Sequence, residues 1–291
     1  MKKGLSVQFF SNAVSMTYIE KQLCYVQRKK TTEEQLEETI GEMVENLRIK
    51  VEETHMDRVD TFVTLPHEKV RTYSMLQYPN FQGLKGQKLN QALQLHLEDE
   101  LELKLNKPIY YYHTFENENN RLMTVSVVEE DEISIYPHLL FEKKFNLKKI
   151  QLESDSIREY AINNSQIDKE ETSVFVHFFF DGEERQVGFY VYKGDFLAAI
   201  RYLPMDYYDY KTLKSELDVV ISDCAQKIEG FFINTYCIIS DDEKDYHSLN
   251  NYYQNGEEEL LFLKEKYPAS KGVLQIVNLD DKGGKGYEEF E

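Results

Sequence analysis

Three apolar segments separated by tight turns dominate the second half of the chain. Residues 174–180 form a continuous apolar and aromatic run, which is typical of a strand buried on both faces. Asp181-Gly182 supplies the first turn, because glycine tolerates the positive φ that tight hairpins need. Two further apolar runs, at residues 186–192 and 196–202, predict strands that each reverse the direction of the chain after a turn. We therefore expect an antiparallel meander of three strands, followed by a long helix and another strand.

Residues 5–65 repeat this order of elements, although the two halves share no obvious sequence identity. Apolar runs predict three strands, at residues 5–10, 14–20 and 23–29. The helix that follows is amphipathic, with one apolar face made by Leu36, Ile40, Met43, Val44, Leu47 and Val51. A short strand at residues 59–65 stops at Pro66. The repeat is one of pattern: three strands, a helix and a strand.

Between the two repeats we expect an inserted α/β subdomain with its own strands and helix. Its strands are predicted at residues 70–78, 109–115 and 122–128. Its helices are predicted at residues 86–101 and, more weakly, 132–144, where Pro137 falls inside the pattern. A strand at 149–153 and a helix capped by Ser154 lead back to the second repeat.

The C-terminal part is predicted less sharply. After a strand at residues 236–240, a Tyr- and Glu-rich helical stretch reaches residue 267, and residues 273–279 read as a last strand. The tail is rich in glycine and charge, so we expect it to be disordered. The predicted division is a first lobe at 1–68 and 145–172, an inserted subdomain at 69–144, a second lobe at 173–279 and a tail at 280–291.

The charge balance limits the classes of partner that we expect the chain to bind. The chain has 291 residues, about two domains' worth, and a formal net charge of −18. A nucleic acid is not expected as a partner, because its phosphates would be repelled, and adhesion to an anionic membrane surface is disfavoured for the same reason. No apolar run approaches the roughly 18 residues that span a bilayer, so we expect a cytoplasmic protein without direct membrane insertion.

Candidate chemistry is sparse. Cys24, Cys224 and Cys237 lie in apolar runs and are predicted to be buried thiols, and no metal site is expected from the Cys and His spacing. His67-Glu68 begins a metalloprotease-like motif, but no second His follows, so we interpret it as a turn after Pro66. The tyrosine clusters around Tyr110 and Tyr207 leave core packing and an interface role both open.

Several local features carry a resemblance to a known family. They are the strand ending in Leu65-Pro66, the edge strand starting at Val70-Arg71, the strand from Lys149-Ile150 to Glu153, and Gly194 with Ile200-Arg201 at the end of the meander. With these features the chain resembles the cytoplasmic PilM proteins of type IV pilus assembly and the cytoplasmic domain of the type II secretion protein GspL. The resemblance implies an α/β actin-like fold, with duplicated RNase H-like lobes in βββαβ order and an inserted α/β subdomain.

The same resemblance implies an adaptor. Such a protein lies in the cytoplasm at the inner-membrane face and links a membrane assembly protein, PilN-like or GspM-like, to a motor ATPase. A homodimer stays open. The predicted partner-binding residues are in or near the inserted subdomain, where an edge strand could accept a peptide strand: Val70, Arg71, Tyr73, Tyr78, Leu89, Leu93, Tyr110 and Tyr112.

The chain departs from nucleotide-binding members of this fold in three loops. The phosphate hairpins lack the small and glycine-rich residues that hold magnesium and phosphate, and the adenosine-side loop carries acids instead of glycine. The degenerate positions are Gln8, Ser11, His177, Asp181, Gly182, Glu183 and Asp241. We therefore expect no cofactor, no catalytic residue and no enzymatic activity, as in a pseudo-ATPase. The alternatives are an actin-like ATP-binding protein with divergent loops, and a cytoskeletal or cell-division scaffold.

Overall fold

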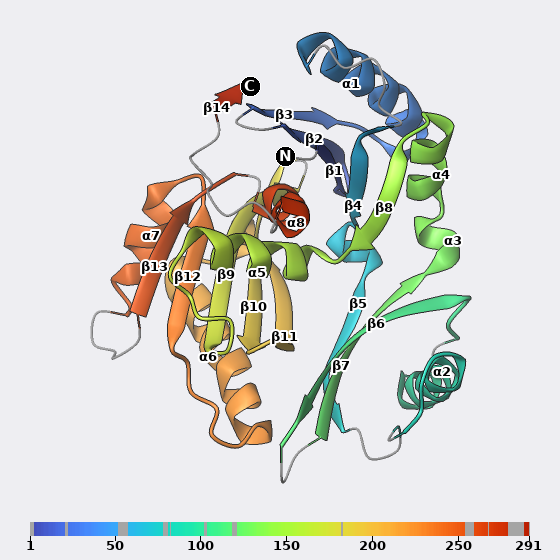
Figure 1. The fold of residues 1–291 in the computed structure, drawn as a ribbon. Helices are drawn as coiled ribbons and strands as arrows, with labels where there is room; N and C mark the ends of the chain where they lie inside the picture. The colour runs from blue at the N-terminus through green and yellow to red at the C-terminus, as the bar shows by residue number, and fades with distance from the viewer. Residues whose placement is uncertain are drawn as a thin grey trace.

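The computed structural model describes most of the chain, namely residues 3–20, 23–51, 58–77, 81, 83–101, 104–117, 121–181, 183–253, 259–266, 268–278 and 288–290. The described strands form three β-sheets, here called the first, second and third sheets. Figure 1 shows the two larger sheets with helices between and around them, and the third sheet beside the second. None of the described helices is long and apolar enough to span a bilayer.

The first sheet has the strand order β14-β3-β2-β1-β4-β8. Its strands are β1 (Gly4–Phe9), β2 (Ala13–Glu20), β3 (Leu23–Lys30), β4 (Asp60–Thr64), β8 (Asn146–Gln151) and β14 (Glu288–Phe290). β1, β2 and β3 pair antiparallel, while β4 joins β1 in parallel after the crossover helix α1 (Leu36–Val51). α1 buries Ile40, Met43 and Leu47, so the amphipathic face predicted for this helix packs in the first core.

The second sheet has the order β11-β10-β9-β12-β13. Its strands are β9 (Thr172–Asp181), β10 (Glu184–Lys193), β11 (Phe196–Pro204), β12 (Thr235–Ser240) and β13 (Glu259–Lys264). Alternate residues of β9 enter two different cores, with Val174 and Val176 facing α6 (Tyr210–Lys227) and Phe175 facing α5 (Glu153–Asn164). The apolar run at residues 174–180 is therefore buried on both faces up to Phe179, as its sequence predicts.

The third sheet, in the order β5-β7-β6, links the other parts. It comprises β5 (Arg71–Gln77), β6 (Pro108–Glu116) and β7 (Arg121–Glu129), with α2 (Gln87–Leu101) packed on one face. Toward the second sheet, Met75 and Leu122 join the second core and the Phe115 ring lies 5.5 Å from the Phe196 ring. α3 (Glu130–Ile133) and α4 (Ile135–Glu142) then lead back to the first sheet.

Two helices fill the space between the larger sheets, as Figure 1 shows. α5 packs against α8 (Pro268–Asn278) so closely that a Cβ on Gly272 would lie 1.8 Å from the carbonyl oxygen of Ser156. On its other side α8 reaches β1, where a Cβ on Gly4 would lie 2.8 Å from Leu274 Cδ2. Glycine is therefore required at position 272, where the neighbour is backbone, whereas a side chain at position 4 would have to displace the end of the Leu274 side chain.

The C-terminal elements differ from the sequence predictions. The helical stretch predicted up to residue 267 ends with α7 (Glu243–Asn250), and the next described element is the strand β13. The strand predicted at residues 273–279 is wrong, because these residues lie largely in α8, which packs on the first sheet although it was assigned to the second lobe. The tail is not wholly without structure, since Glu288–Phe290 pairs with β3.

A smaller prediction at the start of α5 is also wrong. Ser154 does not cap this helix, because the helix begins at Glu153 and Leu152 has the extended conformation of the N-cap residue. Ser154 lies in the first turn and is buried. The shift of two residues matters for the site, since it brings the Glu153 side chain to the junction between the sheets.

Candidate functional site

Two turns from different sheets hold each other at the junction of the first and second sheets. Ser11 lies in the β1–β2 turn, and Asp181 is the last residue of β9. The backbone N–H of Ser11 donates to Asp181 Oδ1 at 2.9 Å, and Ser11 Oγ lies 2.8 Å from Asp181 Oδ2. Nearby, the Arg28 guanidinium donates to the carbonyl oxygen of Phe180, and Lys30 forms an ion pair with Glu183. The two turns are therefore in direct contact.

Glu68 adds a second carboxyl group to this contact. It lies in the 3₁₀ turn His67–Lys69, and its Oε1 is hydrogen-bonded to the same Ser11 hydroxyl that meets Asp181. A hydroxyl has one hydrogen and cannot donate to two carboxylates, so a proton on Glu68 satisfies the arrangement. Burial, and then the neighbouring Asp181, raise the pKa of Glu68 to about 7. Burial opposes ionisation of Asp181, but hydrogen bonds from Glu68 and Ser11 outweigh it and lower that pKa.

His67 completes a set of three groups that could hold a metal ion. Ligand atoms of His67, Glu68 and Asp181 all lie within 4.8 Å of one another, and one nitrogen with two carboxylate oxygens suits a divalent cation. This set could not be predicted from residue spacing, because Asp181 is far from the other two in the chain and reaches them only through the fold. The His67 ring also stacks on Tyr202, with ring centroids 4.3 Å apart, and burial lowers its pKa.

A second polar group lies deeper in the same junction. Gln8 Nε2 donates to Glu153 Oε1 at 3.2 Å, and Ser270 Oγ donates to Gln8 Oε1 at 3.2 Å. Burial raises the pKa of Glu153 to about 8 and lowers the pKa of His177 to about 3. Both side chains are therefore neutral at pH 7. Among the described residues, neither ring nitrogen of His177 has a hydrogen-bond partner.

The third loop, between β12 and α7, is closed on itself. Asp245 is fully buried, forms an ion pair with Arg185, and accepts hydrogen bonds from Tyr210 and Ser240. Asp242 caps α7 by accepting from the backbone N–H of Lys244 at 2.9 Å. Asp241 is exposed at the surface of this loop. Asp242 and Asp245 thus stabilise the start of α7 and its contacts with β10 and α6.

A cavity of about 240 Å³ opens beside the β1–β2 turn. Aromatic and aliphatic side chains form its walls and hydroxyl and charged groups line it, the residues being Phe9, Phe10, Ser11, Thr31, Thr32, Glu33, Leu36, Pro66, Glu68, Lys69 and Tyr136. The Tyr136 ring lies 4.3 Å from the Phe9 ring and is buried. Burial, helped by Glu33, Glu68 and Glu132, raises the Tyr136 pKa to about 12.

The predicted partner-binding residues are dispersed. Leu89 and Leu93 are buried in the core that α2 forms with the third sheet, and partner binding through them stays a prediction. Tyr73 and Tyr110 pack against the same core, and the Tyr110 hydroxyl is buried. Tyr112, on the edge strand β6, is 47% exposed.

At the start of β5 the predicted residues are closer to the surface. Val70 packs against the first core, while Arg71 is exposed and lies 3.4 Å from Glu129. β5 is an edge strand, as predicted, and is interrupted at Met75, whose φ is 55°. Tyr78, and Gly182 of the degenerate loops, lie outside the described residues.

Comparison with known proteins places the fold. No protein-family profile matches the chain, and no curated protein is significantly similar in sequence. A solved PilM–PilN type IV pilus biogenesis complex has a chain with a TM-score of 0.56 and 8% identity, covering 89% of this chain and 88% of that one. A Bacteroides thetaiotaomicron protein of unknown function, with an actin-like ATPase fold, gives 0.54 at 10% identity, covering 94% and 96%.

The cytoplasmic domain of EpsL, an inner-membrane component of the type II secretion system of Vibrio cholerae, gives a TM-score of 0.52 at 12% identity and covers 97% of both chains. The three structures confirm the predicted α/β actin-like fold and the structural resemblance to PilM and to the GspL-type domain. At these identities the likeness is one of fold.

The residues at the junction do not fit a nucleotide. A phosphate held by the turns of this fold needs free backbone N–H donors and a metal ion between acids and phosphate. Here the Ser11 N–H is given to Asp181, and the Gln8 amide to Glu153. The carboxyl groups of Glu68 and Asp181 occupy the contact between the turns, and without a cation on the His67, Glu68 and Asp181 set they would repel phosphate oxygens.

Proposed function

We propose that this chain is a non-catalytic adaptor of a type IV pilus or type II secretion-like machine. Its role is to bind the cytoplasmic segment of an inner-membrane assembly protein, PilN-like or GspM-like, and to connect it to a motor ATPase from the cytoplasmic side. The likeness of its fold to the PilM–PilN complex and to the EpsL domain supports this role. The observation that carries the proposal is the direct contact of Ser11, Glu68 and Asp181 between the two turns.

The cavity beside the β1–β2 turn is our candidate for the partner site. It combines aromatic walls with hydroxyl groups and side chains of both charges, which suits a peptide segment carrying apolar and polar groups. It also adjoins Lys69, immediately before the exposed start of the edge strand β5. A segment anchored there could continue along that edge, which joins the cavity to the predicted residues Val70 and Arg71.

The test is a binding titration with a synthetic peptide. The peptide should carry the N-terminal cytoplasmic residues of the inner-membrane protein encoded beside this one, and calorimetry should be run on the full chain. Thr32→Trp fills the cavity from its exposed rim, so we expect the affinity to fall at least about tenfold, which is about 1.4 kcal/mol.

Glu34→Trp is the matched control. Glu34 is exposed in the same 3₁₀ turn, Glu33–Gln35, but does not line the cavity, so this variant should bind as the wild type does. Absence of binding by the wild-type chain would remove the proposed partner. Equal binding by both tryptophan variants would keep the partner and reject the cavity as its site.

A further inference from the structure

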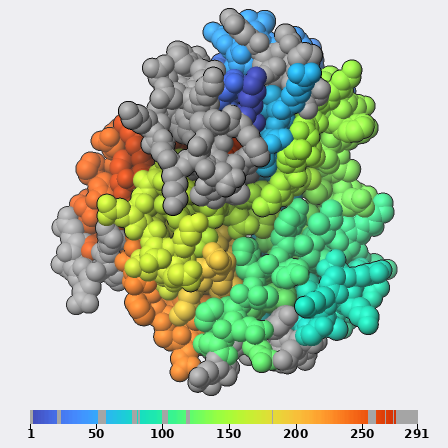
Figure 2. Space-filling model, in the orientation of Figure 1, coloured from blue at the N-terminus to red at the C-terminus, as the bar shows by residue number. Residues whose placement is uncertain are grey.

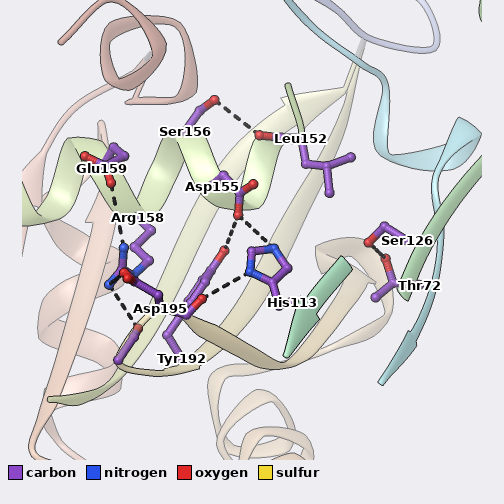
Figure 3. A network of polar contacts seen from close by, with 11 residues as sticks. Thr72, His113, Ser126, Leu152, Asp155, Ser156, Arg158, Glu159, Tyr192 and Asp195 are labelled. Atoms are coloured by element: carbon purple, nitrogen blue, oxygen red, sulfur yellow. Dashed lines mark hydrogen bonds and ion pairs between the residues drawn. The ribbon is translucent and has the colours of Figure 1, made fainter. Parts of the chain in front are cut away.

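His113 stands where three separate parts of the fold meet (Figure 3). It comes from β6 of the third sheet, whereas Asp155 and Arg158 come from α5 and Asp195 from the turn between β10 and β11. His113 Nε2 lies 3.3 Å from Asp155 Oδ1, and Nδ1 lies 3.1 Å from the carbonyl oxygen of Asp195. The histidine side chain is about four-fifths buried by these neighbours, at 20% exposure. Figure 2 shows the surface of the third sheet lying directly against that of α5.

Both partners of the His113 ring are acceptors. A backbone carbonyl oxygen can only accept, and an ionised carboxylate likewise only accepts. The Asp155 oxygen that faces His113 also accepts from the Tyr192 hydroxyl at 3.0 Å. A neutral imidazole has one N–H and could satisfy one of its two partners, whereas an imidazolium donates to both. The two contacts together therefore call for the protonated ring.

The turn that presents the Asp195 carbonyl is itself fixed. The buried Arg158 guanidinium donates to the carbonyl oxygens of Lys169 and Gly194, at 3.0 and 2.9 Å, and forms an ion pair with the Asp195 carboxylate at 2.8 Å. Gly194 has a φ of +58°, which the turn needs and glycine allows. Hence the acceptor for His113 Nδ1 is held in place from α5, independently of the third sheet.

The charges around His113 favour the cation. From α5, Asp155 attracts it and Arg158 opposes it; from the β10–β11 hairpin come the Tyr192 phenol and the exposed Asp195 carboxylate, which is paired with Arg158. Burial lowers the His113 pKa, but the hydrogen bond and charge of Asp155 outweigh burial and raise it overall. Burial opposes ionisation of Asp155, yet its contacts with His113, Tyr192 and Lys149 lower its pKa. Tyr192 stays neutral, because burial raises its pKa well above 10.

We propose that His113 is a proton-dependent clasp, which as an imidazolium ties the third sheet to both α5 and the β10–β11 turn and which on losing its proton releases one of them. This inference goes beyond the adaptor function and does not depend on it. Because the folded-state pKa is raised, the stabilisation is complete below the ordinary value of about 6.5 and is lost as the pH rises through the folded value. The third sheet is therefore held most firmly below about pH 6.5 and loosened as the pH rises through the folded-state pKa of His113.

The direct test is an NMR titration of the histidine ring nitrogens in the full wild-type chain. His138 is the internal control, since its exposed ring has a single ion-pair partner, Glu142, at 3.2 Å. We expect the His113 ring to keep its proton to a pH above the ordinary value of about 6.5. A His113 titration midpoint at or below about 6.5 would overturn the proposal without any variant being made.

Hydrogen–deuterium exchange of His113→Gln and His138→Gln extends the test to the clasp itself. Protection of the β6 amides, corrected for intrinsic rates, should fall several-fold between pH 6 and pH 9 in the wild type and in His138→Gln. The fall should be clearly smaller in His113→Gln, whose side chain at this position cannot be protonated. The same pH dependence in His113→Gln as in the wild type would show that another group is responsible and would contradict the proposal.

Discussion

The chain is held together at two polar junctions that use charge in opposite ways. At the junction of the first and second sheets, the carboxyl groups of Glu68 and Asp181 converge on one Ser11 hydroxyl. At the junction with the third sheet, two cations alternate with acceptors: His113 lies between Asp155 and the Asp195 carbonyl, and Arg158 binds two carbonyls and a carboxylate. The first junction thus has surplus acid, whereas the second is matched in charge.

The first junction is built from turns that bind a ligand in other proteins of this fold, whereas the second is built from contacts that this chain makes. The turns that meet at the first junction are those that hold phosphate in nucleotide-binding proteins of this fold, and here they bind each other. At the second junction the Arg158 guanidinium binds the carbonyls of Lys169 and Gly194 and the Asp195 carboxylate, and the His113 ring faces two acceptors. Both junctions weaken as pH rises: the first because Glu68 ionises beside Asp181, the second because His113 loses its charge.

The largest expected effect comes from removing Arg158, one of the two cations at the junction with the third sheet. Arg158→Ala leaves the carbonyls of Lys169 and Gly194 without their buried donor, so we expect a loss of about 3 kcal/mol in the free energy of unfolding. Urea denaturation measures it. Arg121→Ala, at an exposed position on β7, is the control and should change stability by less than about 0.5 kcal/mol. Equal stabilities of the two variants would refute the role given to Arg158.

An intermediate effect is expected at the acidic junction. Asp181→Ala removes the acceptor of both the Ser11 N–H and its hydroxyl, which should cost about 1–2 kcal/mol in urea denaturation at pH 7. Glu183→Ala is the neighbouring control, because its side chain is 83% exposed and its ion pair with Lys30 contributes little. If Asp181→Ala were as stable as the wild type, the contact between the turns would not hold the sheets together.

The smallest expected effect tests the proton that we place on the Glu68 carboxyl group beside Asp181. The Glu68 pKa is raised to about 7, so the folded state binds more protons than the unfolded state between about pH 4.5 and 7, and stability falls across that interval. Glu68→Gln imitates the protonated form. It should match the wild type at pH 4.5 and exceed it at pH 8 by less than about 1 kcal/mol, because the side chain is 38% exposed and screened by solvent. If Glu68→Gln were less stable than the wild type at pH 8, the proton assigned to Glu68 would be contradicted.

The strands of both repeats could be predicted because alternation and turn residues determine them locally. The C-terminal elements could not, since the short apolar run around Leu274 fits a strand as well as a helix by periodicity alone. Tertiary packing decides that this run is a helix, because α8 buries Leu274 in a small core with Ile19 and Phe62. The helix starts at Pro268, a residue suited to the first helical turn.

The site was predictable in part for the same reason. Ser11 and Asp181 could be recognised as degenerate loop positions, because the order of the strands places them at equivalent turns. Glu68 was interpreted as part of a turn, which it is, but its role depends on a contact with Asp181 that sequence spacing does not reveal. His113 gave still less signal, since it is one residue in a half-buried aromatic strand and both of its partners come from other parts of the chain.

The central claim is that the chain's own side chains fill the nucleotide position of its actin-like fold. Isothermal calorimetry of the full chain with ATP and magnesium, up to about millimolar nucleotide, tests it most directly. We predict no heat of binding and, in a parallel thermal scan, no rise in Tm. A micromolar Kd, with the increase in stability that saturating ligand must bring, would contradict the account.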